Sequence, residues 1–172
     1  MALEVKKPTK NVEIVTDLQA IETALQLADA AKKISDENPD GMTEAEASKA
    51  RREFNKAKSE ARKALQAVDA STIIITLKGL NFSKFYLILN NNTHEDENGR
   101  DTTDWEKVVT DALPEMFVTA EWKDGHGTVS EEDVKSLVSS LTDSQMADLI
   151  VAVRTLNDPA TNIPKELRDL FD

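Results

Sequence analysis

The sequence predicts a mainly α-helical protein, in which an N-terminal antiparallel helical hairpin is followed by a small helical domain with one or two short β-strands. Three observations support this fold class. Apolar residues recur at steps of three and four along much of the chain, which is the spacing of a helix face. Ser, Thr and Asp stand at cap positions before several of these runs. A run of consecutive β-branched apolar residues, which favours a strand, occurs at Ile73 to Ile75.

The expected hairpin covers residues 16–70 and begins with a helix that Thr16 or Asp17 can cap. The apolar stripe of this helix is narrow and consists of Leu18, Ile21, Leu25, Ala28 and Ile34. Turn formers and helix breakers occupy residues 36–41, so we expect the first helix to end near Ser35.

The second helix of the hairpin is predicted to begin at Thr43, because Thr43 and Glu46 have the spacing of a capping box. Its apolar positions continue for three heptads at Ala47, Ala50, Phe54, Ala57, Ala61, Ala64 and Val68. Alanine lets a neighbouring helix approach closely, but each alanine buries little area, at about 25 cal/mol per Å². We therefore expect a modestly stable hairpin that also docks on the second half of the chain or on another chain.

Two segments are expected to be extended. Residues 1–15 form an arm with a short alternating run around Val12 and Ile14, and residues 71–77 contain the isoleucine run. An unpaired strand would expose an edge of hydrogen-bonding groups. The two segments are therefore expected to pair with each other, or one of them with a partner chain.

Residues 71–172 are predicted to form an acidic helical domain led by the second strand. After a helix at 82–89 and a polar loop at 93–104, Thr103 and Glu106 have capping-box spacing. We expect Pro114 to restart or kink the helix that they open, and its apolar side to continue through Met116, Phe117, Ala120 and Trp122. Further helices are expected after the capping pairs Ser130 with Asp133 and Thr142 with Gln145, and at 165–171.

Charge is distributed unevenly between the two halves. Residues 1–70 contain 12 basic and 13 acidic side chains, whereas residues 71–172 contain 9 basic and 19 acidic side chains. An acidic field repels phosphate backbones, and the basic residues of the first half alternate with Glu53 and Glu60 as on a solvated helix face. We therefore expect no nucleic-acid partner. The longest apolar run is far shorter than the roughly 20 residues that cross a membrane, and no apolar signal segment opens the chain, so we expect a soluble intracellular protein without a membrane partner.

The residues that carry chemistry are sparse. His94 and His126 each lie in a polar segment without a second histidine nearby, and the chain has no cysteine. The stretch from Asp36 to Gly41 matches the first half of a calcium-binding loop, but Ala47 stands where the bidentate Glu is needed and Pro39 interrupts the loop. No phosphate-binding loop, nucleophile elbow or zinc-protease motif is present. We predict no catalytic, cofactor or metal site, and hence no enzyme activity.

Aromatic residues concentrate in the second half, which indicates where the main core lies. Tryptophan and phenylalanine beside loops often contribute to interaction surfaces, and a close-packing alanine seam accepts a further helix. The residues that we expect to contact other proteins are Ala50, Phe54, Ala57, Ala61, Trp105, Phe117 and Trp122.

The order of features over residues 73–158 resembles the tail assembly chaperones of long-tailed, siphovirus-type bacteriophages. A short strand leads into the turn Leu77-Lys78-Gly79-Leu80, which is followed by an aromatic helix from Phe82 to Leu89 and an acidic loop. A Trp-containing helix with a central Pro114 and a pair of final helices, opened by Ser130 and Thr142, complete the resemblance. The hairpin at 16–70 departs from the shorter lead-in of that family.

The resemblance implies a non-catalytic protein of the host cytoplasm during phage assembly. Its partners would be the tape measure protein, which it binds and keeps soluble, and the tail-tube protein, whose subunits it helps recruit; self-association is a further expectation. The family often makes a longer product by ribosomal frameshifting, which the codons of Ile163 to Lys165 would allow if they contain a slippery heptamer. The alternative is a structural virion protein, an adaptor in the tail or capsid that uses its N-terminal arm and hairpin for subunit contacts.

Overall fold

A computed structural model describes residues 6–36 and 43–158. Helices account for 62% of these residues, and a small antiparallel sheet accompanies them, so the mainly α-helical class is confirmed. The helices are α1 (Leu18–Asp36), α2 (Glu44–Ala70), α3 (Phe82–Asn91), α4 (Trp105–Met116), α5 (Glu131–Val138) and α6 (Asp143–Asn157). The strands are β1 (Thr9–Val15), β2 (Thr72–Lys78), β3 (Thr93–Glu95), β4 (Asp101–Thr103) and β5 (Phe117–Trp122).

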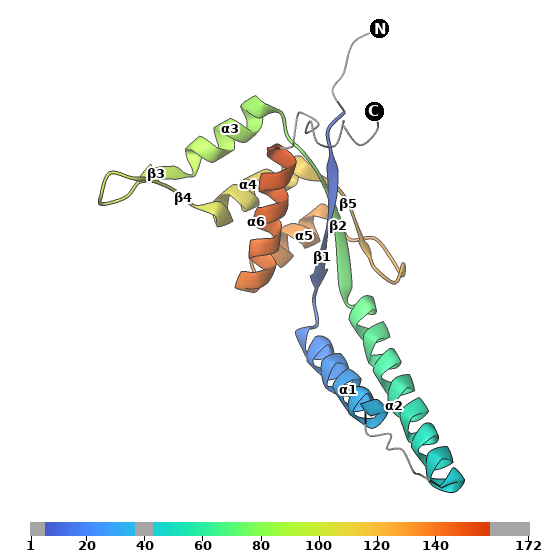
Figure 1. Cartoon of the computed structure of the whole chain (residues 1–172). Helices are drawn as coiled ribbons and strands as arrows, with labels where there is room; N and C mark the ends of the chain where they lie inside the picture. The colour runs from blue at the N-terminus through green and yellow to red at the C-terminus, as the bar shows by residue number, and fades with distance from the viewer. Residues whose placement is uncertain (1–5, 37–42, 159–172) are drawn as a thin grey trace, which may run out of the picture. The chain divides into compact units, whose positions relative to one another are not determined.

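Strands β1, β2 and β5 form a three-stranded sheet in that order (Figure 1). β1 and β2 are antiparallel, because the Gly79 N–H donates to the Pro8 carbonyl at one end and the Thr16 N–H donates to the Ser71 carbonyl at the other. The predicted pairing of the first strand with the isoleucine strand is therefore confirmed. β2 is the central strand, and most of its side chains are buried, as expected for a β-branched run.

The described residues form two compact units. One, which we call the hairpin unit, comprises Glu13–Ile74 and Glu121–Thr128 and contains α1 and α2. The other described residues make up the helical unit, which contains α3 to α6 and the β3–β4 ribbon.

In the hairpin unit, α1 and α2 pack along each other in antiparallel directions (Figure 1). Leu25, near the start of α1, lines the same groove as Leu65, near the end of α2. Ile34, near the end of α1, lies beside Ala47, near the start of α2. Among the described residues of these two helices, Ala31 alone is buried, so the packing between them leaves most side chains in contact with solvent.

Both helices of the hairpin begin at the predicted caps. The Asp17 carboxylate accepts hydrogen bonds from the N–H groups of Gln19 and Ala20 at 3.1 and 3.2 Å. Thr43 and Glu46 form a reciprocal capping box, in which the Thr43 N–H donates to the Glu46 carboxylate at 2.9 Å. These bonds satisfy N–H groups that a helix cannot pair internally.

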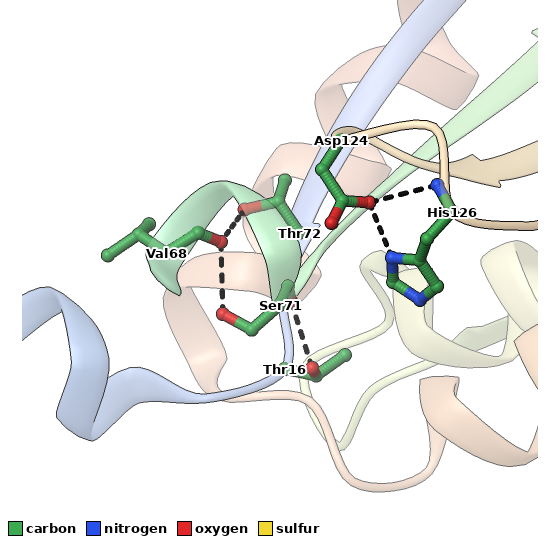
Figure 2. A network of polar contacts seen from close by, with 6 residues as sticks. All are labelled: Thr16, Val68, Ser71, Thr72, Asp124 and His126. Carbon is green, nitrogen blue, oxygen red and sulfur yellow. Dashed lines mark hydrogen bonds and ion pairs between the residues drawn. The ribbon is translucent and has the colours of Figure 1, made fainter. Parts of the chain in front are cut away.

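Hydrogen bonds at the base of the hairpin join its helices to the strands (Figure 2). The N–H and the hydroxyl of Thr16 both donate to the Ser71 carbonyl, at 2.8 and 2.9 Å. The hydroxyls of Ser71 and Thr72 donate to the Val68 carbonyl at 3.0 and 2.7 Å. The Val68 carbonyl, at the C-terminus of α2, accepts these two bonds in addition to one from the Ser71 N–H at 3.1 Å.

In the helical unit, α4 packs against α3, α5 and α6. The buried side of α4 consists of Val108, Val109, Ala112, Leu113 and Met116. That of α6 consists of Leu149, Ala152, Val153 and Leu156. Gly79 lies so close to α6 that an added Cβ atom would stand 2.6 Å from the Leu156 carbonyl oxygen, and glycine alone fits without a shift of the backbone.

The prediction that the Trp105 helix continues to Trp122 is wrong. The helix ends at Met116, and Phe117–Trp122 form β5. Pro114 cannot donate a helical hydrogen bond, and the β-branched Val118 and Thr119 that follow favour a strand. Pairing with β2 then decides the conformation, as the bond from the Lys123 N–H to the Thr72 carbonyl at 2.8 Å illustrates.

The predicted polar loop at 93–104 and the Thr103 cap also need correction. β3 and β4 form an antiparallel ribbon there, in which Thr93 lies opposite Thr103 and their hydroxyls are hydrogen-bonded at 2.9 Å. Asp104 caps α4 instead of Thr103, since its carboxylate accepts from the Lys107 N–H at 3.1 Å. With β5, this ribbon raises the number of strands among the described residues above the one or two expected.

The remaining helix predictions are confirmed where the structure describes them. α3 occupies the expected aromatic segment, and Ser130 and Thr142 cap α5 and α6 through their hydroxyls. The helix predicted at 165–171 lies outside the described residues, as do residues 37–41 of the predicted turn.

Candidate functional site

Polar side chains in the described part of the chain serve local structure. Within residues 6–36 and 43–158, no three His, Asp or Glu side chains are grouped so as to hold a metal ion. In the same ranges, every buried side-chain nitrogen and oxygen has a hydrogen-bond partner. Most of the loop that resembles half a calcium site lies outside these ranges.

The two histidines lie in different settings. His94 is exposed in β3, whereas His126 lies in the turn that follows β5. The Asp124 carboxylate accepts from the His126 N–H at 3.1 Å and contacts the imidazole Nδ1 (Figure 2). The bond from the His126 N–H holds the pKa of Asp124 below its usual value. Trp122 stacks on the imidazole with 4.9 Å between ring centroids, so this cluster stabilises a tight turn.

Exposed aromatic side chains on α3 form the first candidate interaction surface. Phe82 is 82% exposed and stacks on the half-exposed Tyr86, with ring centroids 5.5 Å apart. Phe85 lies three residues from Phe82 and is half-buried, so it borders the exposed pair on the same helix. An exposed phenylalanine of this kind is costly in water unless a partner covers it.

Phe85 also lines a groove of about 490 Å³, whose lining does not include Phe82 or Tyr86. Phe85, Trp105 and Val151 supply its apolar lining, and Arg154 and Asp158 supply charge. The Arg154 guanidinium lies over the Trp105 ring, 4.9 Å from its centroid. We call Phe82, Tyr86, Phe85, Trp105 and Val151 together the aromatic face.

The place of Trp105 at this groove depends on where α4 begins. Trp105 is the first residue of the helix, directly after the cap Asp104. Hydrogen bonds from Lys107 hold the pKa of Asp104 below its usual value, and the Lys107 ammonium lies 3.0 Å from this carboxylate. The cap therefore fixes where the helix begins, and with it the position of the indole.

A second apolar surface lies on the hairpin unit. It is a groove of about 560 Å³ between α1 and α2, lined by Ile21, Leu25, Ala28, Ala61, Leu65 and Val68, with Lys58 and Arg62 among the lining residues. Leu25 and Leu65 are 62% and 56% exposed. Ala24 lines it as well, and we call these seven apolar residues the hairpin groove.

The structure does not gather the seven predicted interaction residues at one place. Ala50 and Phe54 are half-buried and line a small cavity with the end of α1, so they serve the packing of the hairpin. Ala57 is half-buried in the same helix, and Ala61 lines the hairpin groove. Trp105 lies in the aromatic face of the helical unit. The other two residues are half-buried at the ends of β5, namely Phe117 and Trp122.

Sequence reasoning missed the most exposed apolar residues of both surfaces. Phe82 and Tyr86 were assigned to packing within the second half, yet they face solvent. Leu18 and Leu25 were assigned to the packed stripe of the first helix, yet both are exposed. Ile21 and Ile34 of the predicted stripe are half-buried as expected, whereas the other half-buried residues of α1 lie outside that stripe: Ala20, Ala24 and Leu27. Leu65 lies next to Ala64 and outside the predicted apolar positions of the second helix. This position in the sequence was a signal that its side chain faces outward.

No helix among the described residues is long and apolar enough to cross a membrane. Comparison with known proteins finds no protein-family model, no curated protein and no solved structure that matches this chain.

Proposed function

We propose that this chain is a tail assembly chaperone of a long-tailed, siphovirus-type bacteriophage. In this proposal it is not an enzyme, and it acts in the host cytoplasm during phage assembly. It binds the tape measure protein, keeps that protein soluble, and helps recruit tail-tube subunits around it. The support for this family is the order of features in the sequence over residues 73–158, with the hairpin as an N-terminal extension. Two of these features differ in the structure, since Phe117–Trp122 is a strand and the segment before α4 contains the β3–β4 ribbon.

The observation that carries the proposal is the aromatic face. A chaperone must cover apolar surface of a partner before assembly, and it needs an apolar surface of its own that remains exposed while the partner is absent. Phe82, Tyr86 and the groove beside Trp105 offer aromatic anchors of the kind that dominate binding energy at interfaces. An amphipathic helix of the tape measure protein would place its apolar side against this face.

The charge of the second half supports the same role. Residues 71–172 carry a net charge of −10 at pH 7, from 9 basic and 19 acidic side chains. A strongly charged exterior keeps a complex with an apolar partner in solution. The aromatic face would therefore bind the partner while the acidic surroundings prevent the complexes from associating with one another.

Coexpression with the tape measure protein of the same phage tests this proposal. The wild-type chain should copurify with the tape measure protein and raise its soluble fraction. The double variant Phe82→Glu with Tyr86→Glu should weaken binding by about tenfold or more, because both anchors lose their apolar contacts. Asn91→Glu with Ser136→Glu adds the same two charges at exposed positions of α3 and α5 outside the aromatic face and is the matched control. Unchanged binding by the double variant would contradict the proposal.

The alternative proposal is a structural virion protein that acts as an adaptor in the tail or capsid. The exposed apolar groove of the hairpin favours this alternative, since subunit contacts also need such a surface. Mass spectrometry of purified virions separates the two functions. A chaperone should be absent from the mature particle, whereas a structural subunit should be present in stoichiometric amount.

A further inference from the structure

We infer that residues 159–172 fold back along α6 as a short amphipathic helix and cover the groove beside Trp105. The described part of the chain ends at Asp158, and Asp158 itself lines this groove. Docking of the 159–172 segment does not depend on the proposed function, whereas its competition with a partner for the groove rests on that function.

The groove follows the exposed side of α6. Val151, Arg154, Thr155 and Asp158 line it, and their spacing places them within two turns on one side of that helix. Val151 is 56% exposed, although the opposite side of α6 is buried. An apolar lining that is open to solvent on an otherwise packed helix offers a surface that a further segment can cover.

The sequence beyond α6 has the features of a short amphipathic helix. Pro159 directly follows the C-cap of α6, and Pro164 has the fixed φ that suits the first turn of a new helix. Leu167, Leu170 and Phe171 then recur at steps of three and four, which places them on one side. Isolated helices shorter than about 12–15 residues are marginal in water. This helix therefore needs a surface on which its apolar side is buried.

The length of the segment and its connection both fit the groove. Residues 159–163 would form the turn, and antiparallel helices are commonly joined by roughly two to eight residues. A helix from Pro164 to Phe171 rises about 10 Å, at about 1.5 Å per residue, and α6 rises equally far from Val151 to Asp158. An antiparallel return from Asp158 thus carries the apolar side of the segment along the whole lining that α6 supplies.

A segment of the same chain has an advantage over a separate partner at this groove. It is tethered at the edge, because Asp158 lines the groove and Pro159 follows it. A short linker gives an effective concentration on the order of millimolar, so apolar contacts of a few side chains suffice to keep the groove covered. Phe82 and Tyr86 do not line the groove and remain exposed.

NMR carbon chemical shifts of the full chain test the inference. Residues 165–171 should have helical shifts that do not vary with protein concentration. Leu167→Glu with Phe171→Glu should abolish these helical shifts, because the helix loses the contacts that hold it, and should move the indole N–H signal of Trp105. Lys165→Gln with Arg168→Gln makes the same change in net charge at polar positions of the segment and should leave both observations unchanged.

A substitution in the groove tests where the segment binds. Val151→Glu should also abolish the helical shifts of residues 165–171, because it places a carboxylate on the covered surface. Ala147→Glu makes the same charge change one turn earlier, at an exposed position of α6 that does not line the groove, and should leave the shifts unchanged.

Three outcomes would overturn the inference. The first is a wild-type chain in which residues 165–171 have the shifts of a random coil. The second is helical shifts that survive Val151→Glu. The third is helical shifts that appear only at high protein concentration, because they would assign the groove to the segment of a second copy.

Binding of the tape measure protein separates this inference from the proposed function. A partner that uses the groove must displace the segment, so the covered chain binds more weakly than a chain whose groove is open. Leu167→Glu with Phe171→Glu should therefore lower the dissociation constant by about threefold or more, and equal constants would overturn the competition. If neither chain binds while wild-type residues 165–171 have helical shifts that Val151→Glu abolishes, the proposed function fails and the docking of the segment stands.

Discussion

The helical unit and the hairpin unit use the same local signals to form helices but differ in what their helices bury. α4 and α6 contribute large side chains that are fully enclosed, such as Leu113 and Leu149. α2 is longer than either helix and begins with an equally complete capping box, yet none of its residues is buried. Capping and spacing therefore determine that a helix forms, whereas the size of the side chains on its inner side determines how firmly it is held.

Alanine accounts for much of this difference. The seam of α2 consists mostly of alanines, whose small side chains remove little apolar surface from water, at about 25 cal/mol per Å². The exposed leucines lie beside the seam, on the groove. A hairpin built in this way stabilises itself weakly and leaves three leucines exposed, namely Leu25 and Leu65 of the groove and also Leu18. The helical unit differs, since α4 and α6 bury large apolar side chains, although Phe82, Leu87, Val118 and Val151 are exposed elsewhere on it.

The largest expected effect is a loss of stability on truncating the core of the helical unit. Leu149→Ala should reduce the free energy of unfolding by about 2–5 kcal/mol, because it leaves a cavity at a fully buried position. Leu18→Ala, the matched change at a 46% exposed position of the hairpin, should cost less than about 1 kcal/mol. Urea denaturation followed by circular dichroism measures both. Equal losses would show that the hairpin contains a core comparable with that of the helical unit.

Replacing a glycine by alanine should affect stability differently in the two units. Gly79→Ala should destabilise the protein by about 1–3 kcal/mol, because its Cβ would stand 2.6 Å from a backbone oxygen of α6 that cannot move alone. Gly127→Ala, in the turn of the hairpin unit, should be nearly neutral, since its Cβ would lie 3.8 Å from the Trp122 ring. Thermal unfolding of the two variants provides the comparison. A neutral Gly79→Ala would mean that the backbone at Gly79 approaches α6 less closely.

The smallest expected effect is a difference in pH dependence between the capping box that opens α2 and the one that opens α6. The side-chain and backbone hydrogen bonds from Thr43 hold the pKa of Glu46 below 4.5. The bond therefore stabilises α2 fully above the unfolded pKa of 4.5, and this contribution is lost as the pH falls through the lower folded value. The box that opens α6 uses Thr142 and Gln145 and has no proton to gain.

Carbon chemical shifts of the first turns of α2 and α6, followed by NMR between pH 6 and pH 2.5, measure this difference. The first turn of α2 should lose helicity in acid, whereas that of α6 should not do so through its capping pair. Glu46→Gln should abolish the acid response of α2, because glutamine retains the capping geometry without a titratable group. A response that persists in Glu46→Gln would assign it to another carboxylate.

Much of the helical framework was predictable because its causes are local. Asp17, Thr43, Ser130 and Thr142 bond to N–H groups within three residues, so their positions in the sequence suffice to locate helix starts. The pairing of β1 with β2 was predictable for a different reason, because the segments at 12–15 and 71–77 were the two extended segments recognised. β5 was missed because its apolar residues also fit a helical spacing, and its conformation depends on the edge of β2.

The candidate surfaces were less predictable than the fold. Trp105 was identified because it begins a helix beside a loop. The sequence around it does not indicate that Val151 and Arg154 line the same groove. The exposure of Phe82 and Leu25 was missed because an apolar residue at helical spacing is expected to face inward. Which of two adjacent sides of a helix is covered depends on where the neighbouring helix lies.

The sequence by itself determined the mainly helical class, most of the helix starts, the alanine seam of α2 and the acidic character of the second half. Each of these follows from hydrogen bonds, spacing or charge within a few residues of the chain. The tertiary structure alone decided that Phe117–Trp122 is a strand, that Phe82 and Tyr86 remain exposed, and that Leu25 faces the groove. These features depend on contacts between segments far apart in the sequence, and the position of a partner segment is not encoded at the residue that it covers.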